Sequence, residues 1–163
     1  SCFGCGGQKF WYLRFHETSN VGGNNFATLF DLRFSADGGV TWLPGNMTGN
    51  NAPSPLVALA DAEFAVPSTS AFTVFDSDTT GTAWAPTDTA HPHWVQIDFG
   101  AGNGIWPTHV KYTIYNTGGS DRTPQNFTIR GSNDGFVAQD IVLLTVIGDT
   151  TAVHLTTRTK AIP

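Results

Sequence analysis

The chain has 163 residues, enough for one domain with a sizeable hydrophobic core and short for two. Only 13% of the residues are charged, the net charge is −5, and the eight lysines and arginines are scattered. Because phosphate binding needs clustered basic side chains, this composition argues against a nucleic-acid partner. No apolar run reaches membrane-spanning length, so we expect no membrane insertion, and no apolar signal-peptide segment opens the chain.

Residues 1–8 form a Gly-rich tail ahead of a single predicted domain at 9–163. The tail holds both cysteines of the chain, Cys2 and Cys5, at a spacing that also occurs in half zinc sites and redox pairs. No second pair follows and no βαβ pattern surrounds them, so we favour a tail with free thiols. The core then has to form without disulfide bonds.

The remaining chain alternates apolar and polar residues in short segments, which are separated by turns rich in Gly, Pro, Asp and Asn. This period of two predicts β-strands. We place them at 9–16, 26–34, 40–42, 93–99, 109–116, 125–130 and 141–147, with a last edge strand at 153–158. Segment 56–65 is apolar and Ala-rich and suits either a short helix or a strand.

Many short strands with frequent turns predict an all-β fold, an antiparallel β-sandwich. The scarcity of Lys and Glu, which usually fill exposed helices, agrees with this prediction. On one face of the alternating segments lie ten apolar side chains that we expect in the core. They are Trp11, Phe15, Phe30, Leu32, Val95, Ile97, Tyr112, Ile114, Phe127 and Ile129.

The most polar turn of the chain spans 76–82, where Asp76 and Asp78 are followed by three threonines, the last of them Thr82. Carboxylate and hydroxyl oxygens on a tight turn, together with backbone carbonyls, are ligands that calcium prefers. The same residues also suit an Asx-turn, in which the aspartates bond to their own backbone and bind no metal. The turn by itself leaves both interpretations open.

Three motifs between residues 75 and 135 follow one another in a characteristic order. The acidic turn ends in Thr-x-Trp at Trp84, W-x-x-x-D-x-G starts at Trp94, and R-x-P-x-x-F-x-I-x-G-S-N-D-G starts at Arg122. This ordered set resembles the discoidin family, the coagulation factor V/VIII type C or galactose-binding-like modules. The resemblance implies a jelly-roll β-sandwich.

Family members commonly finish with an aromatic-x-x-Arg strand and a strand that carries an acidic residue. Here similar segments stand at the start of the chain, as Tyr12-Leu13-Arg14-Phe15 and Leu29-Phe30-Asp31-Leu32. The chain therefore resembles a circularly permuted member. Because the termini of a sandwich often lie close together, such a permutation costs the core little.

The resemblance also implies a structural calcium ion at the acidic turn. Its ligands would be Asp76, Asp78 and Thr82, with Asp31 in the place where the family usually has a glutamate. The shorter Asp31 side chain leaves direct ligation open, since a water molecule can bridge the gap. The ion would fix a loop and supply no chemistry.

Some family members hold sugars with Arg, His and aromatic side chains on loops at one rim. The corresponding ligand-binding candidates here are Arg122, Trp42, Trp106 and His91. Arg122 stands in a Gly/Ser loop, where it is a poor core residue and a good forked donor. Its alternative is a surface ion pair with Asp121 or another surface acid. Pro92 extends the chain between His91 and His93, so we expect their rings to point apart and not to share a metal ion.

No catalytic motif is present in the sequence. The segment 131–135, Gly-Ser-Asn-Asp-Gly, predicts a hairpin turn and lacks the context of a nucleophile elbow, and only two glutamates occur. We therefore predict a binding module that recognises a glycan or mediates adhesion on an extracellular-facing or virion surface, and no enzyme. The alternative is a structural virion component, from a phage head or tail, whose sandwich assembles with neighbouring subunits or copies of itself. A fold-level resemblance cannot separate the two.

Overall fold

The computed structural model describes residues 8–163, so the predictions on Cys2 and Cys5 lie outside the described residues. This part of the chain consists of strands, loops and one short 3-10 helix. In chain order the elements are β1 (Tyr12–Asn20), β2 (Leu29–Ser35), β3 (Val57–Ala60), η1 (Ala71–Val74), β4 (His93–Asp98), β5 (His109–Ile114), β6 (Asn116–Thr117), β7 (Ser120–Asp121), β8 (Pro124–Ser132), β9 (Ile141–Val146) and β10 (Thr157–Ala161). Over residues 8–163 no helix has the length and apolar character to cross a membrane.

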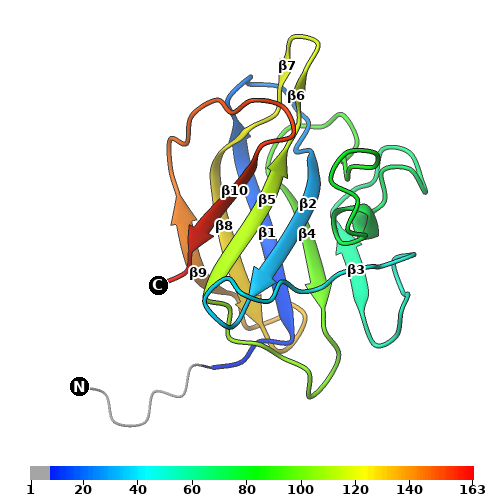
Figure 1. Ribbon diagram of the computed structural model, residues 1–163, viewed down its shortest axis with the longest axis vertical. Coiled ribbons are helices and arrows are strands. Elements are labelled where there is room, and N and C mark those ends of the chain that lie inside the picture. The colour runs from blue at the N-terminus through cyan, green and yellow to red at the C-terminus, as the bar shows by residue number, and fades with distance from the viewer. Residues whose placement is uncertain (1–7) are drawn as a thin grey trace.

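Two sheets pack face to face and form the sandwich (Figure 1). The larger sheet has five strands in the order β3-β4-β1-β8-β9, and the smaller has three in the order β10-β5-β2. All neighbouring strands are antiparallel. The hairpin of β6 and β7 projects from one end, which we call the hairpin end (Figure 1). The predicted all-β antiparallel β-sandwich is confirmed.

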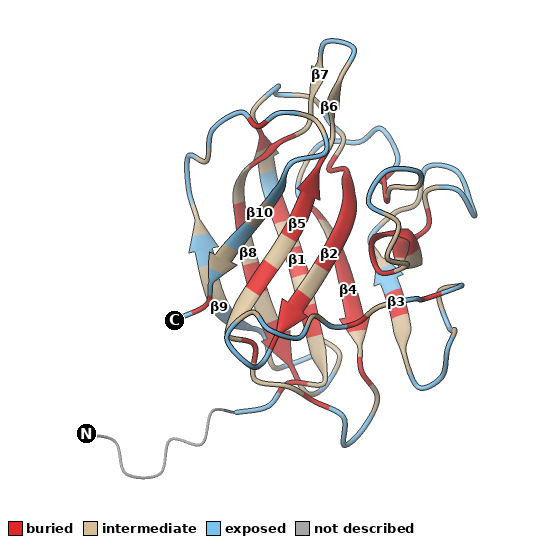
Figure 2. Ribbon diagram, viewed as in Figure 1, coloured by how far each residue is buried: buried red, intermediate tan, exposed pale blue. Residues whose placement is uncertain are grey.

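Buried residues alternate with more exposed ones along the inner strands (Figure 2), and the buried side chains form one core cluster. Phe15 on β1 pairs with Val95 on β4 and Ile129 on β8, and all three are fully buried. Phe15 also stacks on Phe127 with ring centres 4.7 Å apart. Nine of the ten predicted core side chains are buried. Trp11 is only half-buried, because it precedes β1 and lies outside the paired region.

Three segments differ from the predicted strands. Residues 40–42 form a turn, because Asp37 Oδ1 accepts the backbone N–H groups of Val40 and Thr41. The edge strand of the smaller sheet is β10, later than the predicted 153–158, since the chain turns at Leu155, whose φ is 64°, before it pairs with β5. Within segment 56–65, which suited either a helix or a strand, Val57–Ala60 form β3 and the rest is loop.

Candidate functional site

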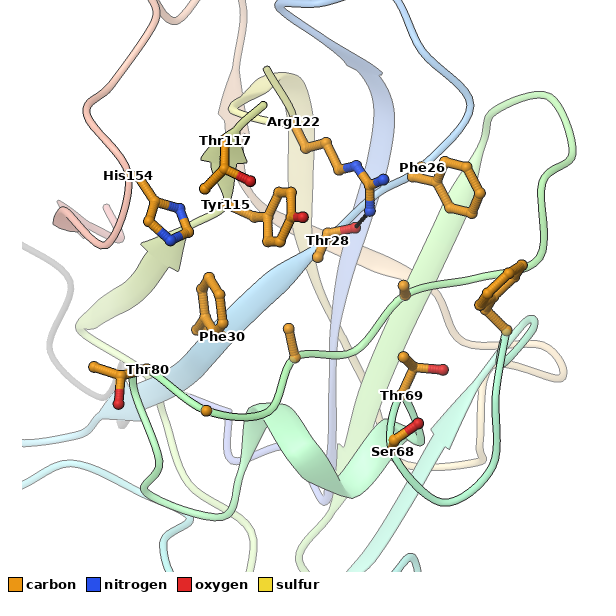
Figure 3. A pocket seen from close by; sticks show the side chains of 14 residues that line it. Phe26, Thr28, Phe30, Ser68, Thr69, Thr80, Tyr115, Thr117, Arg122 and His154 are labelled. Carbon is orange, nitrogen blue, oxygen red and sulfur yellow. Dashed lines mark hydrogen bonds between the residues drawn. The ribbon is translucent and has the colours of Figure 1, made fainter. Parts of the chain in front are cut away.

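An open pocket of about 490 Å³ lies at the hairpin end of the sandwich (Figure 3). Segments far apart in the sequence form its wall: the loops before β2, η1, β8 and β10, the acidic turn, and the residue that follows β5. Among the four predicted ligand-binding residues, Arg122 is the one that lines this pocket. The acidic turn contributes Thr80 and Gly81 to the same wall.

A β-bulge in β2 turns Phe30 toward the pocket. Leu29 pairs with Ile114 and Asp31 pairs with Thr113, so Phe30 is an extra residue without a partner on β5. Phe30 is buried as predicted, but it does not belong to the main core cluster. The regular alternation that we expected over 26–34 is therefore wrong at this residue, because a bulge re-aims its side chain.

Phe30, Tyr115 and His154 form a cluster of three rings on one wall (Figure 3). Phe30 and Tyr115 are stacked with their centres 5.6 Å apart, and His154 lies edge to face against both, at 5.4 and 5.5 Å. The Nδ1 atom of His154 accepts the backbone N–H of Asn116 at 3.1 Å, which leaves Nε2 to carry the ring proton. This wall therefore combines apolar ring faces with a hydroxyl and an N–H at their edges.

Arg122 adjoins this wall, and its guanidinium lies over the rings of Phe26 and Tyr115. Its guanidinium carbon is 4.4 Å from the ring centre of Phe26 and 4.7 Å from that of Tyr115. Nε donates to the Ser120 hydroxyl at 3.1 Å. Nη1 donates to the Thr28 hydroxyl at 2.9 Å (Figure 3). Burial lowers the pKa of Arg122 from its usual value. The side chain is thus fixed in one orientation by stacking and by hydrogen bonds.

The alternative reading of Arg122, a surface ion pair with Asp121, does not occur among the described residues. The Asp121 carboxylate instead accepts the backbone N–H of Thr123 and the hydroxyl of Thr151, both at 2.9 Å. Burial by itself raises the pKa of the Asp121 carboxyl. The hydrogen bonds that the carboxylate accepts and the charge of Arg158 lower this pKa by more, so it lies below the usual value. The guanidinium of Arg122 therefore remains available to the pocket.

The acidic turn adopts the Asx-turn geometry. Asp76 Oδ1 accepts the backbone N–H of Asp78 at 2.8 Å, and its Oδ2 accepts the Thr82 hydroxyl at 2.7 Å. Asp78 Oδ1 accepts the backbone N–H groups of Thr80 and Gly81. These bonds shape the loop that presents Thr80 and Gly81 to the pocket. Over residues 8–163 no group of three or more His, Cys, Asp or Glu side chains converges as a metal site would require.

The four predicted calcium ligands nevertheless belong to one region. Asp31 is buried and pairs with Arg33, whose Nε lies 3.0 Å from Oδ1. Burial is the main cause that raises the pKa of Asp31; the charge and hydrogen bond of Arg33 and the charge of Lys111 oppose it, and the charge of Asp76 makes a smaller raising contribution. Burial also raises the pKa of Asp76. A calcium ion at this turn stays a prediction.

Trp42 and Trp106 do not reach the pocket. The Lys111 ammonium lies 4.7 Å from the ring centre of Trp42, beside the first half of β5. Trp106 precedes β5 and stacks on Phe10 with ring centres 6.1 Å apart. Because β5 runs from this region toward the hairpin end, one small ligand cannot contact either tryptophan together with Arg122.

His91 contacts a buried carboxylate that we did not single out from the sequence. Its Nε2 lies 3.1 Å from Oε1 of Glu17, which is fully buried. Burial, and next the charge of His93, lower the pKa of His91. The rings of His91 and His93 lie edge to face, 5.1 Å apart, so the expectation that they point apart is wrong. Both nitrogens of His93 already face oxygen atoms, Asp61 Oδ2 at 2.7 Å and the Thr89 carbonyl at 2.8 Å.

The strand pattern contained a signal for Glu17. Leu13, Phe15 and Glu17 follow one another at every second position of β1, and all three side chains are fully buried on the core face. Burial raises the pKa of Glu17 well above its usual value, against a smaller opposing effect of the His93 charge. An acidic residue in register with two core residues thus marks a buried polar group.

Comparison with known proteins gives no family for the chain. No protein-family model matches it, and no curated protein matches it in sequence.

Proposed function

We propose that this protein is a non-catalytic binding module that holds a sugar of a glycan in the pocket at the hairpin end. The single observation that carries the proposal is the composition of this pocket: stacked rings, hydroxyls and one fixed guanidinium around a space of about 490 Å³. Sites for small ligands commonly measure about 300–1,000 Å³ and combine apolar walls with a few fixed polar groups. Adhesion at an extracellular-facing or virion surface would use such a module.

The chemistry of the wall suits a sugar. A sugar ring offers an apolar C–H face, which packs on aromatic rings such as Tyr115, and hydroxyls at its edge, which need forked donors and acceptors. Arg122, Thr80 and Ser68 supply such groups from three directions (Figure 3). The residues that line the pocket include no Asp, Glu or Cys, which favours binding over hydrolysis. The resemblance of residues 75–135 to the discoidin family supports the same proposal.

A glycan array with paired variants tests this function. Tyr115→Ala removes one wall of the pocket, and Tyr12→Ala is the matched control, because Tyr12 begins β1 at the opposite end and packs against Phe136. We expect Tyr115→Ala to weaken binding of array-positive glycans by at least about tenfold, or roughly 1.4 kcal/mol, while the control binds like wild type. Binding that survives Tyr115→Ala unchanged, or an array without any glycan signal, would refute the proposal.

A second candidate function, subunit assembly, is favoured by the free edge of the larger sheet. Strand β9 lies at that edge and has the sequence Ile-Val-Leu-Leu-Thr-Val, without a charged residue. Ile141 and Val142 on it are 42% and 50% exposed. Apolar, uncharged edge strands readily pair with another strand. A structural virion component would use this edge to contact neighbouring subunits.

A further inference from the structure

We infer that the sugar bound in this pocket is acidic, and that Arg122 pairs with its carboxylate or sulfate group. This inference rests on the proposed function and adds the class of ligand. It is carried by an imbalance of charge: the pocket holds a fixed guanidinium, and none of the residues that line the pocket is acidic.

Arg122, which lines the pocket, keeps donors that bond to none of the described residues. A guanidinium has five N–H groups. One from Nε goes to Ser120 and one from Nη1 goes to Thr28, and among the described residues no acceptor is bonded to Nη2. The two rings of Phe26 and Tyr115 cover the faces of the guanidinium, so a ligand reaches it through its edge. An edge with adjacent N–H groups matches the two oxygens of a carboxylate or sulfate.

The other arginines show how unusual this arrangement is in the protein. Arg33, Arg130 and Arg158 each form an ion pair, with Asp31, Asp140 and Asp149 respectively. Arg14 is stacked between Trp94 and Phe136, and both its Nε and Nη2 donate to Oε1 of Gln96. Within residues 8–163, Arg122 alone combines stacking with an unbonded Nη2 that belongs to a pocket wall.

The carboxylate whose charge acts on Arg122 does not neutralise it. Asp88 acts on the pKa of Arg122 through its charge, but it is exposed, forms no ion pair with Arg122, and accepts a hydrogen bond from Asn25 at 2.9 Å. His154, the other basic side chain in the pocket, uses Nδ1 as an acceptor. A ligand oxyanion would therefore meet one half-buried cation, to which it could make charge-assisted hydrogen bonds.

The net charge of −5 makes a preference for acidic sugars diagnostic, because the protein as a whole repels anions.

The experiment compares galactan with galacturonan oligosaccharides, glucan with glucuronan oligosaccharides, and plain with sulfated galactan, each by calorimetric titration. We expect the acidic member of at least one pair to bind about tenfold more tightly or better, with an advantage that shrinks as salt rises. A larger gain for the uronates identifies a carboxylate, and a larger gain for sulfated galactan identifies a sulfate.

Variants assign this preference to Arg122. Arg122→Gln should remove the acidic advantage and leave weak binding of the neutral partner, whereas Arg14→Gln, which removes the same charge from another stacked arginine, should keep the advantage. If the melting curve shows that Arg122→Gln does not fold, Arg122→Lys replaces it. Lysine lacks the forked guanidinium, so this variant should lose most of the preference for acidic sugars. Equal binding of neutral and acidic sugars, or a preference for acidic sugars that survives substitution of Arg122, overturns this inference but leaves the proposed function standing. If no sugar binds at all, the proposed function fails and the inference falls with it.

Discussion

Replacement of the buried Glu17 by glutamine should stabilise the protein at neutral and alkaline pH. The Oε2 atom of Glu17 has no hydrogen-bond partner among the described residues, and burial raises the pKa of its carboxyl. Above an unfolded pKa of about 4.3 the unfolded chain releases this proton, while the folded protein keeps it until the raised pKa is reached. The folded state then binds more protons, so the free energy of unfolding falls as pH rises through this window.

The expected magnitude follows from the cost of an unpartnered buried polar group, about 1–3 kcal/mol and more for a charged one. Glu17→Gln should therefore match wild type below about pH 4 and gain at least about 1 kcal/mol above the folded pKa of Glu17, roughly 2–4 °C in Tm. Urea denaturation across this pH range measures the difference. Glu63→Gln is the matched control for the loss of one negative charge, since Glu63 Oε1 already accepts bonds from Asn50 and Ala71. A Glu17→Gln variant that loses stability as pH rises would show instead that Glu17 is ionised and paired with His91.

Three further predictions concern the core, the acidic turn and the free edge. Phe127→Ala should cost about 3–5 kcal/mol in urea denaturation, because Phe127 is buried and stacks on Phe15, and a loss below about 1 kcal/mol would contradict this packing. In protein loaded with calcium, a chelator should lower Tm and Asp76→Ala should abolish that response; identical melting curves with and without chelator argue against the ion. If β9 mediates assembly, light scattering should find oligomers for wild type and monomers for Val142→Lys, whereas a monomeric wild type removes the second candidate function.

The sequence was a good guide wherever a regular period decided the structure. The alternation in β1, β4, β5 and β8 predicted the sandwich and seven of the buried core side chains, because side chains of a paired strand must point alternately to the two faces. The same reasoning failed at Phe30, where a bulge in β2 breaks the period, and at residues 40–42, where the Asp37 side chain competes for backbone N–H groups. Bulges and side-chain caps depend on the partner strand and leave little trace in the period.

The candidate site was harder to predict for a related reason. Arg122 and the acidic turn were recognised as polar groups on loops, but Phe26, Tyr115 and His154 belong to three separate segments that meet only after the sheets have packed. In addition, the sequence around a tryptophan near Gly and Pro does not reveal at which end of the sandwich that tryptophan lies. Local composition therefore indicated which side chains suit a ligand, and the strand order decided which of them meet.

The most direct test of the central claim is to observe the pocket while a sugar binds. The NMR signals of the Arg122 guanidinium and the Tyr115 ring should shift in proportion to the occupancy by the tightest-binding oligosaccharide, because both groups line the pocket. The signals of Arg14 and Tyr12, which do not line it, should stay in place. Shifts at Arg14 or Tyr12 with unchanged signals at Arg122 and Tyr115 would contradict the account and move the recognition surface away from the hairpin end.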